Sequence, residues 1–179
     1  MPETRKTPGR RLLAAAASAA TLFFLSARSP AAVFIVRHAE KQTDANEKEV
    51  PLSEAGRARA RRLAEILRDA RIVAVYSTDT VRTLSTAEPL MKASRIEPAI
   101  YGTGPSGGEP DLKPLADRIR KEHPEGNVLV VGHSNTIAPL VRALGSRETV
   151  EVGAKEYDGL WVVVPAPGDA PVVLLRLRQ

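Results

Sequence analysis

The sequence predicts an α/β fold: a three-layer sandwich with a mainly parallel sheet flanked by helices. Short, continuous apolar runs such as 33–36 alternate along the chain with longer segments in which apolar residues recur at helical spacing. Continuous apolar runs are typical of strands that are covered on both faces, as parallel strands are. Alternation of such runs with amphipathic segments favours a parallel sheet whose strands are connected by helices.

The individual elements follow from this pattern. Segment 54–70 is predicted to be a helix, because Leu63, Ile66 and Leu67 lie on one face of it and Ser53 stands where an N-cap is expected. The other expected strands are 72–76, 97–101 and 128–131, and the other expected helices are 80–93, 111–122 and 135–144. Glycine and proline mark 102–110 as a loop. The last two apolar runs, 160–164 and 172–177, are predicted to be antiparallel edge strands near the C-terminus.

The first 31 residues have a different character. Basic residues up to Arg11 precede an uncharged run over 12–27, and small residues follow around Pro30. This layout is typical of a secretory signal peptide, and the run is shorter than the roughly 20 residues of a membrane span. We therefore expect 1–31 to be a signal peptide, with an uncleaved membrane anchor or a buried helix as alternatives. Residues 32–179 would then form one domain, exported to the bacterial periplasm.

Charge and composition exclude several function classes. Five of the 26 Lys and Arg residues, but only one of the 21 Asp and Glu residues, lie in 1–31, so the predicted domain is nearly neutral. A neutral domain argues against a nucleic-acid partner. We expect the protein to contact a membrane only if the N-terminal segment stays uncleaved. The absence of cysteine excludes disulfides, thiolate nucleophiles and cysteine-ligated zinc. We expect a solvated helix face to carry Arg57, Arg59, Arg61 and Arg62.

Candidate functional residues follow the predicted strands. In open α/β sheets, ligands bind beyond the carboxyl ends of the strands. Arg37 and His38 directly follow the first strand, Arg82 follows the second, and His133 follows the strand at 128–131. Two histidines and two arginines are therefore expected at one edge of the sheet, whereas His123, in a polar stretch, is expected to be structural.

These residues lie in motifs that resemble the histidine phosphatase superfamily, the group of phosphoglycerate mutase and acid phosphatase. Residues 36–40 (VRHAE) resemble its signature, and 131–135 (VGHSN) resemble its second-histidine motif. Segment 52–60 looks like the first helix of the family, and 76–87 resembles its second arginine motif. The four motifs occur in the family's order and span most of the chain after residue 32.

The resemblance implies phosphoryl transfer without a cofactor. His38 would be the nucleophile that forms a phosphohistidine, while Arg37, Arg82 and His133 would donate hydrogen bonds to the phosphoryl oxygens. Fixed positive charge would then supply most of the catalysis. A metal is not expected, because His38, Glu40 and His133 lack a familiar ligand spacing.

The general acid for the leaving oxygen is less clearly marked. Where acid-phosphatase-like members have an aspartate after the second histidine, this chain has Ser134, and the place used by mutase-like members holds Gly102. Glu109 is the favoured candidate, because it lies in a glycine-rich loop that could deliver its carboxylate. Asp111, Glu156 and Asp158 remain alternatives.

The expected function is a phosphatase acting on phosphomonoesters outside the cytoplasm. The chain lacks room for the insertions that cover the site in larger relatives, so an open pocket is expected and mutase activity is not. The partner would be a phosphorylated small molecule or envelope sugar. Two other functions stay open: a non-catalytic phosphate-binding domain, and a phosphohistidine protein phosphatase. The sequence does not predict an oligomeric state.

Overall fold

The computed structural model of the chain describes residues 31–43, 49–103, 110–166 and 172–179. They form a six-stranded sheet in the order β3-β2-β4-β1-β5-β6. The strands are β1 (Val33–Arg37), β2 (Ile72–Ser77), β3 (Pro98–Ile100), β4 (Asn127–Gly132), β5 (Gly159–Val164) and β6 (Val173–Arg178). The four strands from β3 to β1 are parallel, and β5 and β6 are antiparallel. The predicted α/β class and mainly parallel sheet are confirmed.

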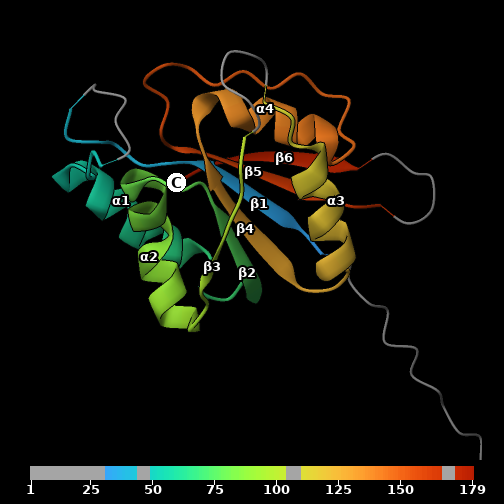
Figure 1. The fold of residues 1–179 in the computed structure, drawn as a ribbon, viewed down its shortest axis with the longest axis horizontal. Coiled ribbons are helices and arrows are strands. Elements are labelled where there is room, and N and C mark those ends of the chain that lie inside the picture. The colour runs from blue at the N-terminus through green and yellow to red at the C-terminus, as the bar shows by residue number, and fades with distance from the viewer. Residues whose placement is uncertain (1–30, 44–48, 104–109, 167–171) are drawn as a thin grey trace, which may run out of the picture.

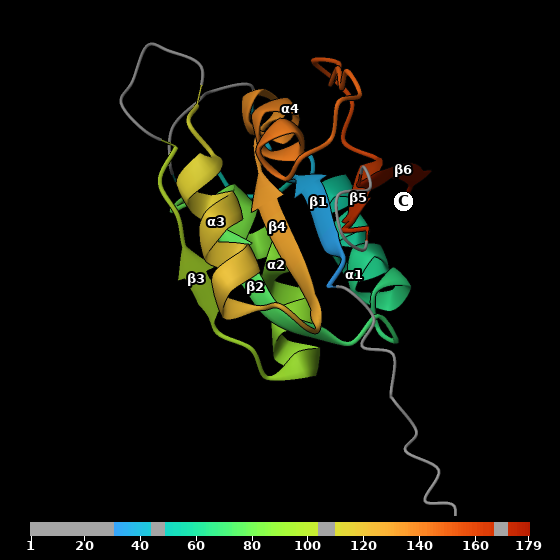
Figure 2. The ribbon, with the colours of Figure 1, turned by 90° about the vertical axis from the view of Figure 1, so that its right-hand side faces the viewer.

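Helices cover both faces of the sheet, as Figures 1 and 2 show. The helices α1 (Glu54–Ile66) and α2 (Val81–Ser94) lie on one face, and α3 (Lys113–Glu122) and α4 (Ser134–Ala143) lie on the other. Each side has its own apolar core. Leu63, Leu90 and Leu129 belong to one buried cluster, while Ile119 and Leu140 belong to the other. The sheet is thus buried on both faces, in agreement with its continuous apolar strands.

Helix boundaries differ from the prediction in ways that local chemistry explains. Ser53 is the N-cap of α1, as expected, and its hydroxyl accepts a hydrogen bond from the Gly56 N–H at 3.1 Å. The helix ends at Ile66 rather than at residue 70, because the chain turns after Leu67. The predicted helix at 111–122 begins at Lys113, whose N–H is held by the Asp111 carboxylate at 3.0 Å.

One prediction for the C-terminal strands needs correction. Of these two strands, β6 alone lies at an edge of the sheet, because β5 lies between β1 and β6 and pairs with both. The physical reason is burial: β5 is apolar throughout, and Leu160 to Val163 are buried, which suits an inner strand. The predicted N-terminal segment lies outside the described residues, apart from Ala31. Among the residues described, the structure contains no helix that is both long and apolar enough to span a membrane.

Candidate active site

The two histidines meet where neighbouring parallel strands end. The His38 N–H donates to the Gly132 carbonyl at 2.9 Å, so the β1–β4 pairing continues to the residue after β1. His133 directly follows Gly132, and the ring centroids of His38 and His133 are 5.4 Å apart. Arg82, in the first turn of α2, reaches the same place. The structure therefore brings the four predicted residues of the strand ends together.

These side chains line a cavity of about 400 Å³. The lining residues are Arg37, His38, Lys41, Arg82, His133, Ser134 and Asn135. Three of them are cations, and none of these described lining residues carries a carboxylate. A concave site with this one-sided charge attracts anions.

The His38 ring is buried and held in one tautomer. His38 is 4% exposed, and its Nδ1 lies 2.8 Å from the Ala39 carbonyl oxygen. A carbonyl can only accept, so Nδ1 carries the hydrogen and Nε2 of the neutral ring keeps its lone pair. Burial, with lesser effects from His133 and the two arginines, lowers the pKa of His38 to about 3 despite the Ala39 hydrogen bond. The ring is therefore neutral at pH 7 with Nε2 as a potential nucleophile.

The turn that carries His38 is held from both helices on one face of the sheet. The Ala39 N–H donates to Thr86 Oγ1 of α2 at 2.9 Å, and that hydroxyl donates to the Arg82 carbonyl at 2.7 Å. On the α1 side, a Cβ at Gly56 would lie 2.1 Å from the Glu40 carbonyl oxygen. Only glycine allows α1 to approach this closely. The turn is thereby fixed in place next to Arg82.

A chain of threonine hydroxyls positions His133. Thr83 Oγ1 donates to the Thr78 carbonyl at 2.8 Å, and Thr78 Oγ1 donates to Thr83 Oγ1 at 3.1 Å. Thr78 Oγ1 lies 2.9 Å from His133 Nε2 and, with its own hydrogen used, accepts from that nitrogen. Burial, followed by the charges of Arg82, Arg37 and Lys41, lowers the pKa of His133 to about 4. Without a ligand, this ring is also neutral at pH 7.

Arg37 is held by a loop that is distant in sequence. Its Nη1 donates to the carbonyls of Gly153, Ala154 and Glu156 at 3.1, 2.9 and 3.2 Å. The Tyr157 ring lies against its guanidinium, with the ring centroid 4.1 Å from Cζ. Its buried Nε has no hydrogen-bond partner among the described residues. One edge of the guanidinium is thus anchored, and a buried donor remains for an anion in the cavity.

Two carboxylates near the cavity are turned to arginines outside it. The Glu40 carboxylate is paired with Arg59, with Nη2 at 2.6 Å and Nε at 2.9 Å. This pair lowers the pKa of Glu40, and it corrects the expectation that Arg59 lies on a solvated helix face. Glu156 Oε1 pairs with Arg176 at 2.5 Å and Arg178 at 3.2 Å on β6. Both carboxylates are therefore engaged by arginines that do not line the cavity.

Comparison with known proteins agrees with this geometry. A family profile described as histidine phosphatase superfamily (branch 1) matches residues 33–101, from β1 through β3, and these include Arg37, His38 and Arg82. Residues 33–101 of the chain thus match the histidine phosphatase superfamily. No curated protein sequence matches it significantly.

Solved structures share the histidine phosphatase fold with this chain. The protein histidine phosphatase SixA in complex with tungstate is 20% identical, with a TM-score of 0.66, covering 82% of this chain and 96% of SixA. A mycobacterial glucosyl-3-phosphoglycerate phosphatase with inorganic phosphate is 18% identical (TM-score 0.63; 82% and 95% covered). YhfR of Bacillus stearothermophilus is also 18% identical (TM-score 0.60; 80% and 95% covered).

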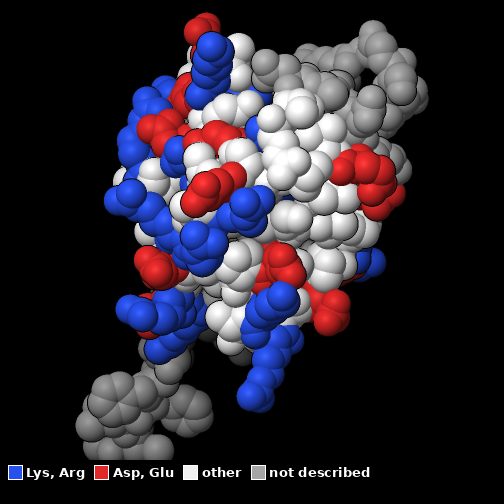
Figure 3. All heavy atoms as spheres, turned by 90° about the vertical axis from the view of Figure 1, so that its left-hand side faces the viewer, with Lys and Arg blue, Asp and Glu red and all other residues white. Residues whose placement is uncertain are grey.

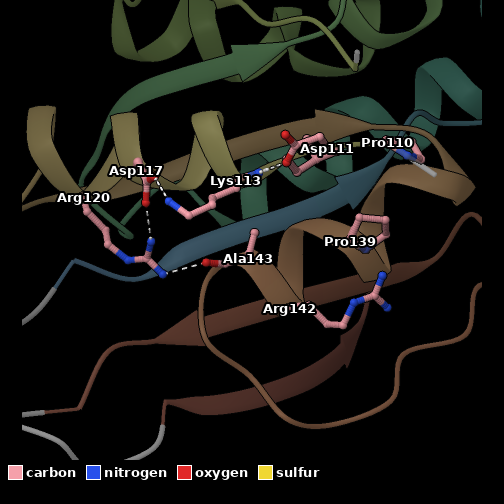
Figure 4. Close-up of a pocket in the computed structure, with 9 residues that line it drawn as sticks. Pro110, Asp111, Lys113, Asp117, Arg120, Pro139, Arg142 and Ala143 are labelled. Carbon is pink, nitrogen blue, oxygen red and sulfur yellow. Dashed lines mark hydrogen bonds and ion pairs between the residues drawn. The ribbon is translucent and has the colours of Figure 1, made fainter. Parts of the chain in front are cut away.

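The structure brings none of the described acid candidates to the cavity lining. Glu156 is tied to β6, and Asp158 pairs with Arg178 at 2.7 Å. Asp111 lines a separate hollow between α3 and α4, where Figure 4 shows it beside Lys113. Glu109, the favoured candidate, lies outside the described residues. The identity of the general acid therefore remains a prediction.

The face that carries α1 and α2 shows Lys and Arg interspersed with Asp and Glu (Figure 3). Charges of both signs are therefore mixed on this face. His123 lies against Tyr76, with Nε2 at 3.1 Å from the phenol oxygen, and does not line the histidine cavity.

Sequence reasoning missed three residues around the site. Lys41 lines the cavity, Thr78 holds His133, and Tyr157 lies against Arg37. A signal existed for Lys41, which is three residues after His38, and for Thr78, which directly follows β2 at the edge where ligands bind. No local signal marked Tyr157, because its contact joins residues 120 positions apart in the chain.

Replacing Glu156 by glutamine should weaken phosphate binding through Arg37. The Glu156 carboxylate joins the Gly153 N–H to two β6 arginines, and thereby shapes the carbonyls that hold Arg37. We expect Glu156→Gln to lower kcat/KM by about 10- to 100-fold, the usual cost of a displaced catalytic group. Inhibition by inorganic phosphate should weaken in parallel. Asp117→Asn, which removes a paired carboxylate on α3, is the control and should change neither; equal effects of the two would refute this positioning role.

Proposed function

We propose that this chain is a phosphatase that hydrolyses phosphomonoesters through a phosphohistidine on His38, outside the cytoplasm. The observation that carries the proposal is the fixed, neutral His38 ring in a cavity shared with Arg37 and Arg82. A neutral ring nitrogen attacks phosphorus only where the charge of the phosphoryl group is neutralised, and the arginines provide that charge. The superfamily profile match over residues 33–101 and the phosphatases among the structural neighbours support this reaction.

The proposed reaction has two displacements. In the first, His38 Nε2 bonds to phosphorus as the ester oxygen leaves and takes a proton from a general acid. In the second, water attacks the phosphohistidine, releasing phosphate and the neutral ring. A bound phosphoryl dianion would raise the pKa of His133, and the protonated ring would become a donor from both nitrogens. Because fixed donors stabilise the transferred group, the proposed mechanism needs no metal.

The expected substrate is a phosphorylated small molecule or envelope sugar. An exported enzyme would meet such compounds, and the pattern of residues 1–31 supports export. A likeness to glucosyl-3-phosphoglycerate phosphatase is compatible with a sugar-derived phosphomonoester. The cavity volume of about 400 Å³ accommodates a small ligand.

A second candidate function is hydrolysis of phosphohistidine on a protein. It is supported by the likeness to SixA, a protein histidine phosphatase that this chain covers almost completely. The two functions are separated by measuring turnover of an aryl phosphate, a sugar phosphate and a phosphohistidine peptide side by side. We expect the two phosphomonoesters to be hydrolysed with the higher kcat/KM. A preference for the peptide would establish the second function, and binding of phosphate without any turnover would indicate a phosphate-binding domain.

Glu109→Gln should slow esters with poor leaving groups selectively. If Glu109 protonates the leaving oxygen, sugar phosphates need that proton and activated aryl phosphates scarcely do. We expect a loss of about 10²-fold or more for the sugar phosphate and little change for the aryl phosphate. The same pair of assays on the alternatives, Asp111→Asn, Glu156→Gln and Asp158→Asn, identifies the acid by elimination. If all these variants affect both substrates equally, or neither, the donor is water or the substrate itself.

A further inference from the structure

The edge strand β6 has an exposed apolar row. Among the described residues, six large apolar side chains are exposed, and three of them alternate along β6: Val173, Leu175 and Leu177, at 51%, 46% and 46%. They lie opposite residues of β5 that pack toward α1 and α2, so the row continues that face of the sheet. Figure 2 shows β6 at the outer edge, next to β5.

The usual protection of an edge strand is weak on β6. Native edges are blunted by bulges, prolines or charges that repel a second strand. The pairing of β5 with β6 runs over six residue pairs without a register shift, and β6 contains no proline. Its two charges, Arg176 and Arg178, are tied back to Glu156 and Asp158 of the same chain. The backbone of β6 is therefore regular, and the charges of its two arginines are largely neutralised within the same chain.

The backbone groups that point outward can be assigned from the ladder. The Gln179 N–H donates to the Asp158 carbonyl, so this pair, in register with the β5–β6 ladder, is of the hydrogen-bonded type. Hydrogen-bonded and non-hydrogen-bonded pairs alternate along antiparallel strands. Residues 173, 175 and 177 therefore direct their backbone groups to β5, whereas Leu174, Arg176 and Arg178 direct theirs to the open edge.

From these observations we propose that β6 pairs antiparallel with β6 of a second copy of the chain, about a two-fold axis at Leu175. In this register Leu174 and Arg176 of one copy exchange hydrogen bonds with Arg176 and Leu174 of the other, using the outward backbone groups. Leu175 faces its own equivalent, and Val173 faces Leu177. A two-fold interface must be self-complementary, and the alternating apolar row meets that condition.

Charge selects this register over the one centred on Arg176. If the axis lay one residue further along, at Arg176, the outward N–H and C=O groups of the two copies could still pair. That register, however, places Arg176 of one copy directly opposite Arg176 of the other. Like charges directly opposite each other destabilise a strand pair. The register about Leu175 places each Arg176 opposite an apolar Leu174. A two-fold axis at Leu175 is thus favoured over one at Arg176, and the sheets of the two copies would form one continuous sheet.

Introduced cysteines test the register directly, because the chain has none of its own. Leu175→Cys in the full chain should form a disulfide-linked dimer on mild oxidation, since the two side chains would face each other in a close, non-hydrogen-bonded pair. Arg176→Cys is the matched control and should cross-link poorly. Val173→Cys and Leu177→Cys should cross-link when mixed but not alone, because equivalent residues lie about 13 Å apart in this register.

A second measurement is the mass in solution. The wild-type full chain should be a dimer at tens of micromolar by sedimentation, and Leu175→Lys should be a monomer with an unchanged melting temperature, because residue 175 is exposed on the single chain. A monomeric wild type, or a dimer that survives Leu175→Lys and cross-links no better at 175 than at 176, would overturn the proposal. The latter result would indicate association through another part of the chain.

Discussion

His38→Ala should abolish turnover while leaving the domain folded. The ring supplies the only nucleophile in the proposed mechanism, and loss of a catalytic nucleophile commonly lowers kcat by about 10⁴-fold or more. His38 lies just beyond β1, where the backbone hydrogen bond from its N–H to Gly132 does not depend on the side chain. Steady-state hydrolysis of an aryl phosphate measures the loss. Undiminished hydrolysis by the variant would refute the role of His38.

His38→Ala should also change how the free energy of unfolding depends on pH. The folded chain holds the pKa of His38 at about 3, below its ordinary value of 6.5. As pH falls from about 6.5 toward 3, the unfolded chain takes up a proton that the folded chain does not, so the wild type loses stability over this range. His38→Ala lacks that contribution and should lose less. Urea unfolding at pH 7 and pH 5 measures the difference, which should be smaller for the variant.

Arg82→Lys should retain the fold and the charge but lose about 10²-fold or more in kcat/KM. A guanidinium presents forked donors that match two phosphoryl oxygens, and an ammonium group cannot reproduce that geometry. Arg82 is 5% exposed and lines the cavity. The ammonium group of a lysine at this position is more strongly hydrated and reaches less far, so it is poorly placed to contact the phosphoryl group.

The matched control is Arg118→Lys, the same substitution at an arginine that pairs with Glu122 on α3 outside the cavity. It should leave kcat/KM unchanged. Near-normal kinetics of Arg82→Lys would mean that Arg82 does not contact the phosphoryl group. A similar loss in both variants would point to a general effect on the fold.

The sequence predicted most of the fold because its strands are apolar and its helices are amphipathic. The four residues at the strand ends were found by one rule, that ligands bind beyond the carboxyl ends of parallel strands. The N-cap at Ser53 was predictable because its chemistry is local. The inner position of β5 was missed, since strand order depends on pairing between segments far apart in the chain.

Long-range contacts also explain what was missed at the site. The anchoring of Arg37 by the carbonyls of residues 153–156 joins segments more than 110 positions apart, and backbone carbonyls leave no mark in a sequence. The alternatives Glu156 and Asp158 were plausible by position, but their arginine partners on β6 could be recognised only in three dimensions. Chemistry encoded by neighbouring residues was thus predictable, and chemistry assembled across the sheet was not.

The central claim, a phosphohistidine on His38, is tested most directly by trapping the intermediate. The enzyme is mixed with an aryl phosphate, quenched within the first turnovers into alkali, which preserves phosphohistidine, and digested for peptide mass spectrometry. We expect one phosphorylated peptide, with the phosphoryl group on His38, and its loss after acid treatment. Phosphate on another residue, or no phosphoenzyme at any time during rapid turnover, would contradict the account.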